Sequence, residues 1–229
     1  MLHHRKFIVG TRSSSLAIAQ TEGIIDLIRK IHLDVDIEII TIETNGDINP
    51  QTPLADFGTS IFAKEIEDTL LRSKIDIAVH SLKDLLTILP PGLILGAVSE
   101  REDPRDVLIN QFDCTIENLP PEAIIGTSSP RRKALLKNLR PDLNVVPIRG
   151  NIDSRLRKIS EDYYDGVILA AAGLNRLGLQ DSINQYLNPK EFIPAVGQGA
   201  LGIEIRNDDY EAQELVDKIN HPATRIAVT

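Results

Sequence analysis

The stretch AIIGTSSPRRKALL, residues 123–136, passes from an apolar run through a turn of small residues into a basic helical segment. The apolar run predicts a strand, and Ser128 or Ser129 followed by Pro130 predicts a helix N-terminus. A second stretch, FIVGTRSSSLAIAQ at residues 7–20, has the same order of strand, Gly-Thr, hydroxyl residues and helix. This repeat predicts two α/β lobes with matching turns.

Apolar runs alternate with helix-period segments along the rest of the chain, which predicts βα units and a mostly parallel sheet in each lobe. The first lobe is expected to have strands at 6–10, 35–43 and 75–81 and helices at 16–30 and 61–73. The second is expected to have strands at 123–126, 144–148 and 165–171, helices at 129–139 and 152–159, and a last segment at 183–187. Residues 192–205 read as a strand with a glycine-rich turn, and residues 208–220 as a helix.

We therefore expect an α/β fold of two lobes like type II periplasmic-binding-protein domains, joined by a two-strand hinge with a cleft between them. Lobe 1 comprises residues 1–100 plus 197–229, and lobe 2 comprises residues 101–196. The charged segment EREDPRD, residues 100–106, is the first crossing. Sheets of this kind bind ligands beyond the carboxyl ends of their strands.

Composition excludes several classes of function. The chain has 229 residues, a net charge of −8 and 4% aromatic residues, so nucleic acid is not the expected partner. No run approaches the ~20 apolar residues of a membrane span, and the N-terminus lacks a secretory signal. The one cysteine suits a reducing compartment, and the scattered histidines form no metal set. We expect a cytoplasmic monomer with no membrane partner and no metal.

Basic residues concentrate in the second lobe, where residues 126–158 contain nine Lys and Arg against two Asp. Arg131 and Arg132 would lie in the first turn of a helix, where each cation opposes the helix dipole by about 0.3–1 kcal/mol. A bound anion would offset that cost. Arg149, Arg155 and Arg12 follow other strand ends, and a solvated basic face remains the alternative for any one of them. No phosphate-loop motif is present, so a small ligand with several carboxylates fits best.

The segment IDIAVHSLKDLLT, residues 75–87, is the best candidate for chemistry. A buried strand delivers Ser81, Lys83 and Asp84 to its carboxyl end, where a carboxylate beside cations could stabilise a cationic intermediate or move a proton. The alternative is that Asp84 caps a turn and Lys83 is solvated. His80 reads as a hydrogen-bonded structural residue.

Five motifs together closely resemble the porphobilinogen deaminase (hydroxymethylbilane synthase) family, in the family's order and spacing from about residue 6 onward. They are HSLKD, GTSSPRR, RGNIDSRL, AAAGLNRLGL and PAVGQGALGIE. The resemblance implies a transferase of heme and tetrapyrrole biosynthesis that condenses four porphobilinogen units onto a dipyrromethane primer, releasing ammonia. Porphobilinogen and linear pyrrole chains are then the small-molecule partners.

The resemblance also implies residue roles. Asp84 would hydrogen-bond pyrrole N–H groups and stabilise the azafulvenium-like cation left by ammonia, and Gln198 would lie at the hinge. The acetate and propionate groups of substrate and primer would be bound by Arg12, Ser13, Ser81, Lys83, Thr127, Ser128, Ser129, Arg131, Arg132, Arg149, Gly150 and Arg155.

The sequence also departs from the family pattern. The family's third domain, whose cysteine holds the primer, would begin where this sequence stops, and Cys114 reads as a structural thiol. The family's loop sequences T-R-G-D and G-G-K-G-L-F become TNGD (44–47) and a shorter GTSIF (58–62), and Leu86 replaces the usual Pro. We expect no covalent dipyrromethane on this chain. Three readings stay open: a fragment or short member, a shortened active enzyme, or a non-catalytic module that binds polycarboxylate pyrroles.

Overall fold

A computed structural model describes residues 5–44, 63–161 and 163–229. The predicted loop departures at 45–47 and 58–62, and the start of the helix expected from residue 61, lie outside the described residues. The chain divides into two compact units, Met1–Glu102 with Ala200–Thr229, and Asp103–Gly199. Each unit is built on its own five-stranded sheet.

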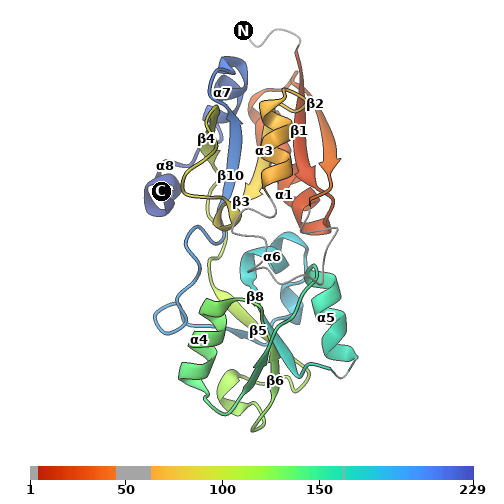
Figure 1. The fold of residues 1–229 in the computed structure, drawn as a ribbon, viewed down its shortest axis with the longest axis vertical. Helices are drawn as coiled ribbons and strands as arrows, with labels where there is room; N and C mark the ends of the chain where they lie inside the picture. Colours follow the sequence, from red (N-terminus) through yellow and green to blue (C-terminus); the bar gives the residue numbers. More distant parts are fainter. Residues whose placement is uncertain (1–4, 45–62, 162) are drawn as a thin grey trace. The chain divides into compact units, whose positions relative to one another are not determined.

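Unit 1 has a mixed sheet with strand order β2-β1-β3-β10-β4, in which β10 runs antiparallel to both neighbours (Figure 1). Its strands are β1 (Lys6–Arg12), β2 (Asp36–Ile42), β3 (Ile77–Ser81), β4 (Leu93–Val98) and β10 (Leu201–Arg206). Its helices are α1 (Ser15–Ile31), α3 (Lys64–Leu71), α7 (Tyr210–Asp217), α8 (Pro222–Val228) and the 3₁₀ turn η2 (Leu82–Asp84).

Helices cover both faces of this sheet because its central strands carry apolar residues on both sides. On one face, Phe7 and Ile203 pack against α1 and α7 in one buried cluster. On the other face, Ile66 and Leu70 of α3 pack against Ala78 of β3. Figure 1 shows α3 in front of the sheet.

Unit 2 repeats the plan with strand order β7-β6-β8-β5-β9. Its strands are β5 (Asp106–Asn110), β6 (Ile124–Gly126), β7 (Asn144–Val146), β8 (Gly166–Ala170) and β9 (Gln185–Tyr186). Its helices are α4 (Pro130–Leu139), α5 (Ile152–Ser160), α6 (Ala171–Arg176) and the 3₁₀ turns η3 (Ile116–Asn118) and η4 (Gln180–Ser182). Leu136 of α4 packs on one face of the sheet and Leu174 of α6 on the other.

The segment 192–205 differs from its prediction as one strand with a turn. Only its last part is a strand, β10, which begins at Leu201. Pro194 provides no N–H for a ladder, and Gly197 and Gly199 take positive φ values of 70° and 93°. The segment before β10 is therefore a turn-rich connection.

Strands β4 and β5 were not predicted from the sequence. All five residues of β5 are buried, including the polar Asp106 and Asn110, so the strand shows neither alternation nor a purely apolar run. Helix α4, in contrast, begins as predicted. Ser129 is its N-cap, accepting a hydrogen bond from the backbone N–H of Arg132 at 3.4 Å, and Pro130 is its first residue.

Candidate functional site

The carboxyl ends of β1 and β3 meet at one edge of the unit 1 sheet, because these neighbouring strands are parallel. Arg12 is the last residue of β1 and Ser81 the last residue of β3. Arg12 is half-buried, and Ser13, directly after it, is exposed. The structure thus brings these three predicted site residues to the same edge.

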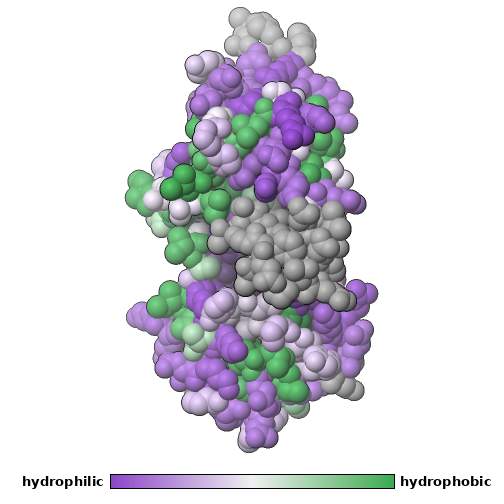
Figure 2. Space-filling view, viewed as in Figure 1, coloured by the Kyte–Doolittle hydropathy of each residue, from purple (hydrophilic) through white to green (hydrophobic). Residues whose placement is uncertain are grey.

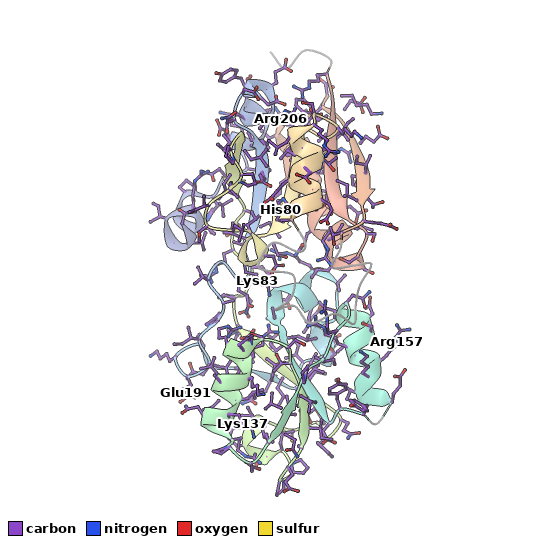
Figure 3. All side chains as sticks on the ribbon, in the orientation of Figure 1. His80, Lys83, Lys137, Arg157, Glu191 and Arg206 are labelled. Atoms are coloured by element: carbon purple, nitrogen blue, oxygen red, sulfur yellow. The ribbon has the colours of Figure 1, made fainter. Side chains whose placement is uncertain are left out.

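Lys83 and Asp84 lie in the 3₁₀ turn η2 that follows β3 directly. The backbone N–H of Leu82 donates to the carbonyl of Ala200 at 3.1 Å, which ties the turn to the start of β10. Lys83 is exposed and Asp84 half-buried. Figure 3 shows Lys83 at the end of the unit 1 sheet opposite Arg206.

Ser81 is held from the side by a helix residue. The Nε2 group of Gln20 in α1 donates to the Ser81 hydroxyl at 3.0 Å. Gln20 is itself 5% exposed, so it has little freedom to turn away. This contact fixes the residue that opens the Lys83 and Asp84 turn.

A buried polar cluster lies behind that turn. His80 Nε2 is 3.1 Å from Glu204 Oε2, and both side chains are buried, as is that of Glu67 in α3. Burial and the nearby Glu204 carboxylate raise the pKa of Glu67. His80 is therefore a residue of the core, as the sequence predicts, and the cluster is part of the support of β3.

The hydroxyl turn of unit 2 uses its side chains to join strand ends. The Ser128 hydroxyl donates to the carbonyl of Ile148 at 2.7 Å and accepts from the N–H of the same residue at 3.1 Å. The Thr127 hydroxyl accepts from the N–H of Ser129 at 3.2 Å. Thr127 is buried, and Ser128 and Ser129 are half-buried. These contacts place the start of α4 beside the chain that follows β7.

Arg131 and Arg132 both contact one buried carboxylate, that of Asp106. From the sequence, the two arginines were instead explained by a bound anion. Arg132 donates to Asp106 Oδ1 from Nε at 3.1 Å and from Nη2 at 2.7 Å, and from Nη1 to the carbonyl of Ile168 at 2.9 Å. Arg131 Nη1 lies 2.7 Å from Asp106 Oδ2. Asp106 is fully buried, so a carboxylate of the protein already pairs with both cations before any anion binds.

The electrostatics of this group follow from its contacts. Burial raises the pKa of the Asp106 carboxyl, but Arg132, Arg131 and Gln198 outweigh it and hold that pKa below its usual range. The Arg132 side chain is 9% exposed and that of Arg131 is 27% exposed. Arg131 therefore reaches solvent far more than its neighbour does.

The third basic turn follows β7, whose neighbour β6 is parallel to it. Arg149 and Arg155 are half-buried, and Arg155 Nε donates to the carbonyl of Gly150 at 2.7 Å. Gly150 has φ +114°, and a Cβ there would lie 2.0 Å from the Ser154 hydroxyl. Glycine is thus required at this turn, whatever the turn binds.

Gln198 is 1% exposed and makes contacts within unit 2. Its Nε2 group donates to the carbonyl of Pro104 at 2.7 Å and to Asp106 Oδ1 at 2.9 Å. It thereby joins the two stretches of chain next to the unit boundaries at residues 102–103 and 199–200. Asp106 was not identified as a site residue from the sequence, because it was assigned to a charged crossing between the lobes. The apolar residues Val-Leu-Ile directly after Asp106 could have indicated that it begins a buried strand.

Other classes of site find no support in the described part of the chain. Residues 5–44, 63–161 and 163–229 contain no group of three or more His, Cys, Asp or Glu side chains placed to hold a metal. None of the helices described there is long and apolar enough to cross a membrane. Cys114 is half-buried against the core of unit 2. Figure 2 shows a mostly hydrophilic face with hydrophobic patches, one over α8, where Ile226 is exposed.

Comparison with known proteins gives consistent matches. The sequence profile described as "Porphobilinogen deaminase, dipyromethane cofactor binding domain" matches residues 7–214. Porphobilinogen deaminases from Syntrophobacter fumaroxidans and Geobacter sulfurreducens are 45% and 49% identical, each over 96% of this chain and over 72% and 69% of the relatives' lengths. The porphobilinogen deaminase of Nitratidesulfovibrio vulgaris is 47% identical over 98% of this chain and 71% of its own length.

Solved structures with a similar fold include a periplasmic substrate-binding protein and a putative methionine-binding lipoprotein. A periplasmic substrate-binding protein of an ABC transporter from Coxiella burnetii matches with a TM-score of 0.57 and 14% identity, covering 96% of this chain and 94% of that one. A putative methionine-binding lipoprotein from Bacillus subtilis matches with a TM-score of 0.55 and 11% identity, covering 96% and 92%. The predicted fold class, α/β lobes of the type II periplasmic-binding-protein kind, is confirmed.

Proposed function

The chain belongs to the porphobilinogen deaminase family, and from that premise we propose that it condenses four porphobilinogen molecules into hydroxymethylbilane with release of ammonia. The family performs this transferase reaction, that of hydroxymethylbilane synthase, in tetrapyrrole biosynthesis. The observation that carries the proposal is the HSLKD segment, which places Lys83 and Asp84 in a turn at the carboxyl end of β3.

Asp84 is proposed as the catalytic residue. Its carboxylate accepts hydrogen bonds from pyrrole N–H groups and stabilises the positive charge that develops as ammonia leaves. A half-buried carboxylate suits this work, because reduced contact with water strengthens its attraction for a cation. The backbone hydrogen bond from Leu82 to Ala200 anchors the start of the turn that carries Asp84.

The carboxylates of the pyrroles are proposed to bind at the strand ends of each unit. In unit 1 the ligands are Arg12, Ser13, Ser81 and Lys83. In unit 2 they are Thr127, Ser128, Ser129, Arg131, Arg149, Gly150 and Arg155. Arg132 and Gln198, both buried, act in this proposal through Asp106 rather than by direct contact.

These residues also fit the dipyrromethane cofactor that the family profile names. Its acid groups need cations that reach solvent, and Lys83 and Arg131 are such cations. When bound, the cofactor supplies the pyrrole to which new units are added. Cys114 does not fit as its anchor, because the thiol lies against the unit 2 core and 3.7 Å from the Asn110 side chain.

Localisation and assembly belong to the same proposal. One cysteine in 229 residues suits a reducing cytoplasm. A monomeric state stays a prediction.

Porphobilinogen consumption by the 229-residue chain, with and without pre-formed linear pyrrole primer, tests the function. We expect consumption that falls at least about 100-fold in Asp84→Asn, the low end of what a positioned charge contributes to catalysis. Asp26→Ala is the matched control, because Asp26 is an exposed carboxylate on α1. Equal rates in wild type and Asp84→Asn would exclude the catalytic role. Tight pyrrole binding without consumption would favour the non-catalytic module.

A further inference from the structure

One buried carboxylate in unit 2 joins three segments that are distant in sequence. Asp106, at the start of β5, contacts Arg131 and Arg132 at the start of α4 and Gln198 in the connection before β10. Three side-chain donors therefore converge on a carboxylate with no solvent exposure. Such convergence restrains the donors, because Arg132 and Gln198 would lose hydrogen bonds to Asp106 by moving and Arg131 would lose its ion pair with it.

The two arginines differ in how many donor groups they use within the protein. Arg132 donates from all three nitrogen groups of its guanidinium, to Asp106 and to the carbonyl of Ile168 in the core. Arg131 uses only Nη1, which lies 2.7 Å from Asp106 Oδ2 and donates to the carbonyl of Ile193 at 2.5 Å. One edge of the Arg131 guanidinium is thus held by the protein, while its side chain remains partly exposed.

We propose that Asp106 is a positioning residue, which holds the Arg131 guanidinium by one edge so that its other edge meets a ligand carboxylate without further ordering. A planar guanidinium can pair with two anions along different edges at once. The long side chain would otherwise lose rotamer freedom on binding, and that loss weakens affinity. The inference rests on the proposed function for the carboxylate ligand at Arg131 and for the choice of porphobilinogen as probe.

Removing the Asp106 charge would change ligand affinity in opposite directions by simple electrostatics and by loss of positioning, so a binding measurement can distinguish the two. The Asp106 charge is negative, so its loss would raise the positive potential at Arg131 and tighten the binding of an acidic ligand. Positioning predicts weaker binding, because Arg131 is released. The direction of the change therefore separates the two effects.

The experiment compares wild type with Asp106→Asn. We expect the Kd for porphobilinogen, measured by calorimetry, to rise about three- to tenfold, the size of the ordering cost of one long side chain. In turnover, KM should rise by a similar factor while kcat changes less than twofold, since Asp84 is untouched. Asp76→Asn is the matched control, because Asp76 is a buried carboxylate that pairs with Arg5 and Arg206 in unit 1. It should lose stability and leave Kd unchanged.

Side-chain NMR of Arg131 provides a second readout that needs neither substrate nor a folded variant. In the wild type without ligand, we expect the Nε–Hε group of Arg131 to be markedly more ordered than that of the exposed Arg72. Order equal to that of Arg72, or a Kd in Asp106→Asn that is unchanged or lower, would overturn the inference. Absence of porphobilinogen binding by the wild type would count against the proposed function instead, and the NMR comparison would still decide the role of Asp106.

Discussion

Replacing Arg132 by Met tests whether this arginine serves the fold of unit 2 or contacts a ligand. The change keeps the apolar stem but removes the three donor groups that Asp106 and the carbonyl of Ile168 accept. Both charges of the Arg132–Asp106 pair are buried, with side-chain exposures of 9% and 0%. Removing one partner of a buried ion pair costs about 3–5 kcal/mol, because the other charge stays in a poor solvent.

The structure places the expected loss near the lower end of that range, at about 3 kcal/mol. Asp106 would keep the Arg131 contact at 2.7 Å and the Gln198 hydrogen bond at 2.9 Å. Even so, the loss is a large part of the 5–15 kcal/mol that a folded domain has. Urea unfolding at pH 7, followed by far-UV circular dichroism, measures it.

The pH dependence of the unfolding free energy provides a second test of the Arg132–Asp106 pair. The pKa of Asp106 is lowered in the folded state, so its stabilising contribution is present above the unfolded pKa of about 3.9 and is lost as pH falls through the folded value. The difference between wild type and Arg132→Met should therefore persist from neutral pH down to about pH 4 and shrink as the medium is acidified below it. A protonated Asp106 needs no counter-charge.

Lys6→Met is the control, because Lys6 pairs with Glu38 on the surface, where the two side chains are 52% and 48% exposed. It should leave the unfolding free energy unchanged within error. An Arg132→Met loss no greater than that of Lys6→Met, together with a raised Kd for porphobilinogen, would refute the reasoning and return Arg132 to the ligand-binding set.

Other outcomes follow from single positions. Gly150→Ala should lower the unfolding free energy by about 1–3 kcal/mol, because φ +114° is open essentially only to glycine. Gly23→Ala, in α1, should instead raise it by about 0.5–1 kcal/mol, because the new Cβ would meet nothing within 4 Å beyond its chain neighbours and the adjacent backbone of α1. The pKa of Glu67 is raised by burial and by Glu204, so the wild type should lose stability relative to Glu67→Gln as pH rises from 4 to 8, and a flat difference in urea unfolding would contradict this. The intact mass of the purified chain should equal the sequence mass of 25.3 kDa, because its Cys114 is half-buried against the unit 2 core, and a gain absent from Cys114→Ser would show a pyrrole on that thiol.

Local sequence predicted the turns well because their determinants are local. Ser129 and Pro130 specify a helix start through one hydrogen bond and one fixed φ angle, and the structure has that start. The end of β3 at Ser81 was predicted correctly, since a short apolar run followed by small residues is a strong strand signal, whereas β1 continues to Arg12, two residues beyond its predicted end. The meeting of Arg12 and Ser81 at one edge then follows from parallel pairing.

The partner of the two arginines was not predictable from local pattern. Asp106 lies 25 residues before Arg131 in the sequence, inside a charged segment that resembles a solvated linker. Only the strand pairing of β5 with β8, and the packing of α4 on that sheet, bring it under the helix start. Counting charges along the sequence detects the excess of cations in residues 126–158. It cannot show which of these cations form ion pairs with a carboxylate that is distant in the sequence.

That pairing also explains how a helix can begin with two arginines before any ligand binds. Cations in the first turn oppose the dipole, and an isolated α4 would be weakened by them. Asp106 pairs with the side chains of both arginines and so reduces the positive charge at that turn. Two cations against one carboxylate leave a net positive charge, and the exposure of the side chains puts it on Arg131 rather than Arg132. The protein therefore pairs the interior part of the charge itself and leaves the outer part exposed, as the proposed binding of an acidic ligand at this turn requires.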